Sequence, residues 1–414
     1  MDRTQQDNLL LIMVDSLRPD YLGRRHRGRP VTPNMDRLAR EGVFMENAFC
    51  PMPSSAPSRA SIFTGRFPHS HGVRVNDMPL AAGETTLPEV LESSGYLTAA
   101  APKLDEGFER GFRRRDIYDA YTASRGDESF PDEAYLITGS AVDWLEEAMD
   151  PWFLWLDYES IHEPWSPPEP FRSIFTEEHD AEEIGSPRMY RPDLSESEVA
   201  HVRALYTAEV AMMDENVGRL LEKLEEEGLR ESTLVVLLSD HGVFLGEHGF
   251  FKKPPFLYDP LMRSTLIFSL PGAVPSAVRV KSLTQIVDVM PTILDLLGMP
   301  APEAFQGRSL KPLFDGGEEV HGAVFMEFCE YRGTAVKAVR TPEWKYIHHR
   351  SVGDLPWPGD FSPREVFRRA GLERDMLFNL PEDPNEGQNL FSEKMDIGNK
   401  LQAMLLDWMI DTEV

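Results

Sequence analysis

Residues 55–59 place a hydroxyl, a proline and an arginine in the order SAPSR, a spacing that suits anion chemistry. Pro57 favours the first turn of a helix, which puts Ser55 at the helix N-terminus. Backbone N–H groups and the helix dipole attract an anion there. Arg59 follows by about one turn and can hold a charged oxygen through its planar guanidinium. The segment therefore predicts an anion site at the start of a helix, although a serine cap and a surface arginine would explain it taken alone.

Three short apolar runs are each followed closely by an aspartate. The runs are residues 9–14, 152–156 and 233–238, and the polar residues after them are Asp15, Asp157, Asp240 and His241. Such runs are typical of buried parallel strands, and ligand sites form where these strands end. One aspartate after a strand is usually a turn former. Asp15 and the Asp240–His241 pair indicate more, because adjacent strands could bring them to one site.

If one site brings them together, these side chains offer oxygen and nitrogen atoms of the kinds that bind a divalent metal ion. Carboxylate oxygens of Asp15 and Asp240, together with an oxygen on residue 55, suit Ca²⁺ or Mg²⁺. The imidazole of His241 shifts the preference toward Mn²⁺ or another transition metal. A core or supporting role for His241 is the alternative.

Amphipathic helical patterns lie between and around the apolar runs. They cover residues 35–42, 87–94, 136–148 and 195–227. Strands that alternate with helices predict an α/β fold with a mostly parallel sheet covered by helices on both faces. Residues 163–193 are rich in proline and acidic side chains, which indicates a surface excursion or a lid near the site.

The last quarter of the chain has a different pattern. Residues 323–330 and 337–348 alternate like strands, and residues 394–409 form an amphipathic helical pattern. We therefore expect two domains, a catalytic α/β domain over residues 1–317 and a small C-terminal α+β subdomain over residues 318–414.

Composition narrows the function. The chain has 414 residues, with 42 Lys and Arg against 69 Asp and Glu, for a net charge of −27. Such an acidic surface argues against nucleic-acid binding, and an anionic substrate would need local cations or a metal. Two cysteines, Cys50 and Cys329, exclude a disulfide framework. The first apolar run is too short for a signal peptide, and no run approaches the roughly 20 residues of a membrane span, so we expect a cytoplasmic protein without membrane attachment.

Residues 55–59, followed by Thr64 and Gly65, resemble the signature of the sulfatase family, C/S-x-P-S-R and then T-G. Further segments match family motifs in order. They are Met13–Asp20, Ser160–Trp165, Leu238–Lys253 and Arg374–Leu390. The resemblance covers nearly the whole chain. It implies an alkaline-phosphatase-like fold with a sheet sandwiched by helices.

The resemblance also implies how residue 55 works. Ser55 occupies the position that the family oxidises to formylglycine, whose hydrate is the nucleophile, so a formylglycine-generating maturase would be a transient partner. Cys50 lacks the proline and arginine at the required spacing and is expected to be a packing residue. The metal ligands would be Asp15, Ser55, Asp240 and His241. The resemblance favours Ca²⁺, with Mn²⁺ or Mg²⁺ as alternatives.

Further catalytic roles follow from the other motifs. Arg59, Lys103 and Lys253 would neutralise the ester oxygens, and Lys253 could instead extend to solvent. His162 would protonate the leaving group, although a histidine before a glutamate–proline pair is otherwise a turn residue. Asn76 would donate to a substrate oxygen, and a plain turn role explains it equally well.

The segment around Lys103 departs from the family pattern G-K-x-H. Pro102 and Asp105 stand where the glycine and histidine are expected. In the family that histidine is thought to take a proton from the sulfated intermediate. Asp105 could take this proton, and contact the substrate, only if it lies close enough.

The most direct interpretation is a metal-dependent sulfatase that hydrolyses a sulfate monoester. A phosphonate monoester or phosphodiester hydrolase of the same superfamily is the alternative, because the Asp240–His241 pair, Asn76 and the missing histidine resemble that branch. Lys103 favours the sulfatases. A third interpretation keeps Ser55 unmodified as a phosphoryl-accepting nucleophile, and a non-enzymatic binding protein has the least support. The alcohol half of the substrate, the metal and a homo-oligomeric state are left open.

Overall fold

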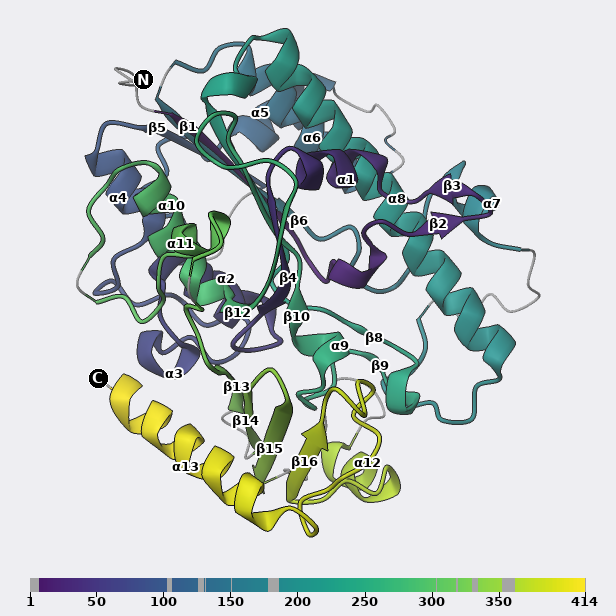
Figure 1. The fold of residues 1–414 in the computed structure, drawn as a ribbon. Coiled ribbons are helices and arrows are strands. Elements are labelled where there is room, and N and C mark those ends of the chain that lie inside the picture. The colour runs from purple at the N-terminus through teal and green to yellow at the C-terminus, as the bar shows by residue number, and fades with distance from the viewer. Residues whose placement is uncertain are drawn as a thin grey trace.

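A central sheet between two layers of helices forms the larger part of the molecule in this computed structural model (Figure 1). The structure describes residues 7–102, 106–125, 130, 132–149, 151–177, 186–302, 304–317, 319–329, 334–351 and 362–413. A smaller antiparallel sheet carries the C-terminal end of the chain. This arrangement confirms the α/β class with a C-terminal α+β subdomain.

The large sheet has the strand order β10-β4-β11-β7-β1-β6-β5, and β12 pairs with β4. Its strands are β1 (Asn8–Val14), β4 (Val43–Phe49), β5 (Leu97–Ala101), β6 (Trp152–Tyr158), β7 (Thr233–Leu238), β10 (Arg263–Ser264), β11 (Leu266–Ser269) and β12 (Val278–Gln285). The pairs β1–β6, β1–β7, β5–β6 and β4–β12 are parallel, whereas β10 and β11 run antiparallel to their neighbours. The carboxyl ends of β1, β6 and β7 therefore meet at one edge.

Alternation along the central strands divides the core into two layers. Leu9, Leu11 and Met13 of β1 pack with one cluster, and Leu10 and Ile12 pack with the other. The first layer includes α2 (Ser55–Thr64), α4 (Leu87–Ser93), α10 (Val289–Leu296) and α11 (Lys311–Phe314). The second includes α1 (Pro33–Arg40), α5 (Ile117–Arg125), α6 (Glu133–Leu145), α7 (Phe171–Phe175) and α8 (Glu196–Glu226). The two layers lie on opposite sides of the sheet in Figure 1.

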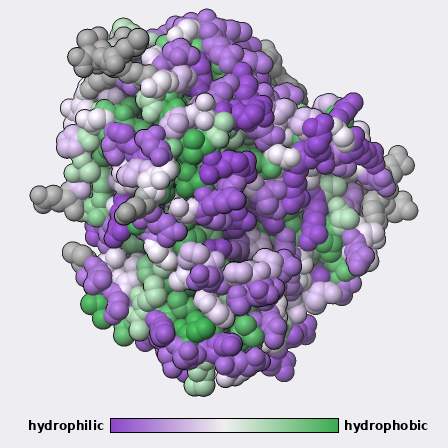
Figure 2. Space-filling model, viewed as in Figure 1, coloured by the Kyte–Doolittle hydropathy of each residue, from purple (hydrophilic) through white to green (hydrophobic). Residues whose placement is uncertain are grey.

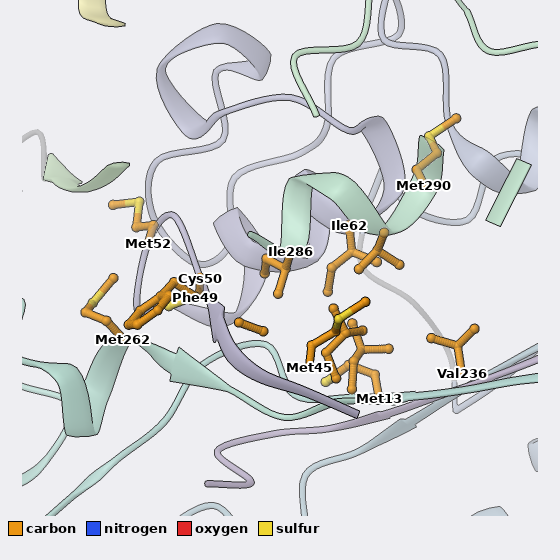
Figure 3. Packing of buried hydrophobic residues seen from close by; sticks show 14 of the residues in the cluster. Met13, Met45, Phe49, Cys50, Met52, Ile62, Val236, Met262, Ile286 and Met290 are labelled. Carbon is orange, nitrogen blue, oxygen red and sulfur yellow. The ribbon is translucent and has the colours of Figure 1, made fainter. Parts of the chain in front are cut away.

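Cys50 belongs to the first of these layers. Its side chain is fully buried among Phe49, Met52 and Met262, as Figure 3 shows. Burial raises the pKa of the Cys50 thiol well above its ordinary value. The thiol therefore stays protonated and unreactive, which agrees with a packing role.

The C-terminal subdomain is a four-stranded antiparallel sheet with a long helix against it. The strands are β13 (Val324–Cys329), β14 (Ala335–Arg340), β15 (Trp344–Ser351) and β16 (Asp375–Asn379), and the helices are α12 (Pro363–Arg369) and α13 (Met395–Thr412). Lys345 of β15 is fully buried, and its Nζ lies 2.8 Å from Asp259 of α9 (Asp259–Met262) and 2.8 Å from Glu386. This cluster ties the subdomain to the large sheet. The expected boundary at residue 317 stays a prediction.

The three apolar runs are confirmed as β1, β6 and β7, and the expected helices correspond to α1, α4, α6, α8 and α13. The single strand expected over residues 337–348 is wrong, because Thr341 and Pro342 turn the chain between β14 and β15.

Within the expected excursion over residues 163–193, the structure describes α7, and residues 178–185 lie outside the described part. Short elements complete the chain: β2 (Arg25–His26), β3 (Arg29–Pro30), α3 (Pro68–His71), β8 (Phe244–Leu245) and β9 (Phe251–Lys252).

Polar side chains cover most of the face visible in Figure 2. Across the described ranges, the structure contains no helix with both the length and the apolar character that a bilayer crossing requires.

Glu327 of β13 connects the subdomain to helix α3. Its side chain is 1% exposed and accepts hydrogen bonds from the backbone N–H of His69 (2.9 Å) and from Lys337 Nζ (2.6 Å). Burial opposes its ionisation, yet these partners lower the pKa of Glu327 to about 2. A carboxylate with a depressed pKa stabilises the fold above its ordinary pKa, and this stabilisation is lost as the pH falls toward the folded value.

We expect Glu327→Gln to lower the free energy of unfolding at pH 7 by about 3 kcal/mol. The difference from the unsubstituted protein should shrink as the pH falls from about 4.5 toward 2, as measured by urea unfolding at each pH. Exposed Glu382 offers a matched control, and Glu382→Gln should change little at any pH. A pH-independent effect of Glu327→Gln would contradict the linkage.

Candidate active site

Asp15, Asp240 and His241 meet where β1 and β7 end. These parallel strands pair with Met13 opposite Leu238, so the residues that follow them leave the sheet side by side. One ligand atom of each of the three residues lies within 4.8 Å of the other two, and all three side chains are buried. The structure thus brings together the donor set expected from the sequence.

Ser55 is the first residue of α2 and faces this cluster. Its Oγ donates a hydrogen bond to Asp15 Oδ2 at 2.9 Å. A hydrogen bond fixes helix α2 to the segment that follows β7, because Ser58 Oγ donates to the backbone carbonyl of Asp240 at 2.5 Å. Ser55 therefore lies at the helix N-terminus expected from SAPSR, with its hydroxyl bonded to the carboxylate of Asp15.

The donor set fits a divalent cation. His241 Nδ1 bonds to the carbonyl of Gly242 at 2.9 Å, which leaves the Nε2 lone pair directed elsewhere. Among the described residues, Asp240 Oδ2 and His241 Nε2 are buried without a hydrogen-bond partner. Burial and the nearby charge of Asp15 raise the pKa of Asp240, and burial lowers the pKa of His241. A bound cation would satisfy both orphaned atoms and stabilise the two carboxylates.

Two cations border the cluster. Lys253 Nζ lies 3.7 Å from Asp15 Oδ1, and an Arg59 nitrogen lies 3.7 Å from Asp15 Oδ2. Burial opposes ionisation of Asp15, but Lys253, His241 and Arg59 together hold its pKa far below the usual range. These neighbours therefore favour the ionised form of Asp15, which is the form in which a carboxylate binds a metal ion.

Arg59 is held by carboxylates that the sequence did not assign to the site. Its guanidinium lies 3.0 Å from Asp157 Oδ1 and 3.3 Å from Glu159 Oε1. Burial raises the pKa of Asp157 to about 8, although Arg59 opposes the shift. The position of Asp157 near the end of a buried strand was a signal for it, whereas nothing in the sequence indicated its pairing with Arg59.

Ser16 is a second residue without an assigned role in the sequence analysis. Its Oγ donates to Asp15 Oδ1 at 2.5 Å, and its backbone N–H donates to Asp240 Oδ1 at 3.2 Å. Ser16 has a φ of 61°, a left-handed conformation that is uncommon outside glycine. It therefore orients both carboxylates at the end of β1.

The remaining candidates lie farther from the cluster. His162 Nδ1 is 2.7 Å from the carbonyl oxygen of Glu163, and its side chain is 38% exposed, so a ligand could reach the ring. Asn76 Oδ1 accepts from Ser54 Oγ (2.9 Å) and from the backbone N–H of Ala56 (3.1 Å), which caps α2. Lys103 and Asp105 lie outside the described residues.

The site thus combines a hydroxyl, a metal-type donor set and converging cations, an arrangement that suits a hydrolase of anionic esters. A family model described as Sulfatase matches residues 7–299, and one described as N-sulphoglucosamine sulphohydrolase, C-terminal, matches residues 246–355. The chain belongs to the sulfatase family and is a sulfuric ester hydrolase of the alkaline phosphatase superfamily.

Known proteins resemble the chain over its whole length. An N-acetylglucosamine-6-O-sulfatase of Bacteroides thetaiotaomicron is 25% identical, with 98% of this chain and 86% of the relative covered. A sulfatase structure in complex with D-glucosamine-2-N,6-O-disulfate has a TM-score of 0.78 at 22% identity and covers 99% of this chain and 98% of its own. The phosphonate monoester hydrolase of Agrobacterium radiobacter also has a TM-score of 0.78, at 23% identity, covering 98% and 96%. The two structures share the fold with this chain.

We expect the protein to bind one divalent ion and Asp240→Ala to abolish binding, because the variant loses an oxygen donor of the cluster. Calorimetric titration with Ca²⁺ and with Mn²⁺ measures this directly. An ion at 100 times its Kd should also stabilise the fold by about 2.7 kcal/mol. Asp143→Ala, which removes an exposed carboxylate, is the matched control and should bind normally. Normal titration of Asp240→Ala would contradict the assigned donor set.

Proposed function

We propose that this sulfatase hydrolyses sulfate monoesters with one divalent metal ion and a formylglycine made from Ser55. The observation that carries the proposal is the position of Ser55 Oγ, 2.9 Å from Asp15 Oδ2 and beside the orphaned donors of Asp240 and His241. A hydroxyl held in this way at a helix N-terminus is placed for attack on an anionic ester.

Asp15, Asp240, His241 and an oxygen on residue 55 would hold the ion, which supplies positive charge to the nucleophile and to the ester oxygens. Ca²⁺ is the preferred ion because oxygen donors predominate, and the imidazole keeps Mn²⁺ and Mg²⁺ as alternatives. Hydrated formylglycine supplies two hydroxyls, one to attack sulfur and one to release sulfate. The second hydroxyl is the feature that plain serine lacks.

The protein's own side chains complete the site. Asp15 accepts the hydrogen bond of residue 55 and orients its oxygen. Arg59 and Lys253 border the same point, and both would stabilise charge on the nonbridging oxygens of the transition state. Lys103 would add a third cation. His162 would protonate the departing alcohol, and Asn76 and Asp105 would contact the substrate.

We expect Ser55 to be oxidised only when a serine-type maturase is present. Co-expression with such a maturase should reduce the mass of the tryptic peptide containing Ser55 by about two hydrogens, before hydration, and should raise turnover of 4-nitrophenyl sulfate. Ser55→Ala is the matched control, with neither mass change nor activity. Rapid sulfate turnover by unmodified protein would instead favour a direct serine nucleophile.

A phosphonate monoester or phosphodiester hydrolase is the second candidate, favoured by the buried His241 in the donor set. We expect the matured enzyme to have a higher kcat/KM for 4-nitrophenyl sulfate than for 4-nitrophenyl phenylphosphonate, as a sulfatase should. The two esters share one leaving group and differ in the transferred group, so the ratio of the two kcat/KM values reports the preference for that group. The opposite ratio would place the second candidate first. Ser55→Ala measured on both esters controls for background hydrolysis.

A further inference from the structure

A cavity of about 880 Å³ is lined by two residues, Glu163 and Lys252, that are chain neighbours of candidate site residues. Residues 186–193 form one wall, α12 forms another, and Glu163 and Lys252 complete the lining. Figure 1 shows β9, which ends at Lys252, on the side of the large sheet that faces α12. The volume is within the range of small-molecule sites, about 300–1,000 Å³.

The lining continues directly from the proposed catalytic residues. Glu163 is the neighbour of His162, and Lys252 is the neighbour of Lys253. The two lysine side chains have different partners. Lys253 Nζ lies 3.7 Å from Asp15, whereas Lys252 Nζ donates to Ser186 Oγ at 2.9 Å. His162 Nδ1 lies 3.8 Å from Glu163 Oε2, so the cavity borders the histidine proposed to protonate the departing alcohol.

Lys252 occupies a backbone position that favours glycine. Its φ is 61°, in the left-handed region where a side chain is strained. Retaining a long cationic side chain in this conformation opposes stability, and such residues gather at functional positions. The strained backbone and the position at the cavity together indicate that the ammonium group of Lys252 contacts a ligand in the cavity.

The charges around the cavity favour an anion. The lining has four cations and three carboxylates in a chain whose net charge is −27. Arg191 pairs with Asp193 at 2.9 Å, and Arg369 pairs with Glu365 at 2.6 Å, so two carboxylates are matched locally. Lys252 bonds to a neutral hydroxyl instead, and its charge is available to a ligand.

Glu163 adds a second type of contact. Its side chain is 11% exposed, and in the part of the chain that the structure describes its Oε2 is buried without a hydrogen-bond partner. A ligand hydroxyl beside it would donate to this oxygen and satisfy it.

We propose that this cavity binds the alcohol half of the sulfate ester and that Lys252 selects an alcohol bearing a second anionic group, such as a carboxylate or another sulfate. In this proposal Glu163 accepts a hydrogen bond from a hydroxyl of the same alcohol. The inference rests on the proposed function and specifies its substrate class.

The test uses matured enzyme and two substrates with nearly equal leaving groups, 3-(4-sulfooxyphenyl)propionate and its methyl ester. Lys252→Gly removes the side chain at a backbone position that suits glycine, so the variant should keep its melting temperature. Its kcat/KM for the acid should fall about tenfold, mainly through KM, while that for the ester should stay within about twofold. Lys252→Gln should behave like Lys252→Gly, because it keeps the length without the charge.

Lys281→Gln is the matched control, because it removes one exposed positive charge elsewhere and should leave the acid-to-ester ratio unchanged. Equal effects of Lys252→Gly on the acid and the ester, or no effect on either, would overturn the inference while leaving the proposed function intact. If matured enzyme hydrolyses the sulfate group of neither substrate, the proposed function is overturned and this inference with it.

Discussion

Two carboxylates buried side by side are the constraint on which the rest of the structure depends. Asp15 and Asp240 are at most 1% exposed, and their charges repel each other in a medium that solvates them poorly. Leaving such a charge uncompensated costs about 3–5 kcal/mol. Lys253 and helix α2, which supplies both Arg59 and its own N-terminus, come from segments far apart in the sequence, and their convergence on this pair is what makes its burial tolerable.

The supports of these cations extend well beyond the sheet edge. Lys253 follows the β8–β9 hairpin, and His248 within that connection stacks on Tyr258 with ring centroids 4.2 Å apart. Tyr258 precedes α9, which the C-terminal subdomain holds through Asp259. The small sheet thus helps to position the segment that carries Lys253 through a chain of contacts, without supplying any of the proposed metal ligands.

Sequence reasoning succeeded where a local pattern determines local structure. The apolar runs ending at Asp15 and before Asp240 predicted two neighbouring strands, and SAPSR predicted the start of α2. It failed where tertiary packing decides. The strand β4 mixes Glu46 and Asn47 with apolar residues and becomes a strand through its pairing partners. The capping of α2 by Asn76 and the pairing of Arg59 with Asp157 join distant segments, and no short pattern encodes them.

The turn between β14 and β15 is a different kind of failure. Thr341 and Pro342 lie in the middle of an alternating pattern, and a proline there is itself evidence against a continuous central strand. The alternation was real on both sides, but it belonged to two strands of a hairpin. At this position the proline is stronger evidence for a turn than the alternating pattern is for a continuous strand.

The fully buried Lys345 limits how this molecule could be recombined with its relatives. Its ammonium group lies between Asp259 of the large domain and Glu386 of the subdomain, with no exposed surface of its own. A chimera that grafts a foreign subdomain after residue 317 would inherit Asp259 without its lysine, and a charge stranded in the interior is costly. Modular exchange in this architecture therefore has to cross over before Asp259, so that the lysine and both carboxylates travel as one inherited unit.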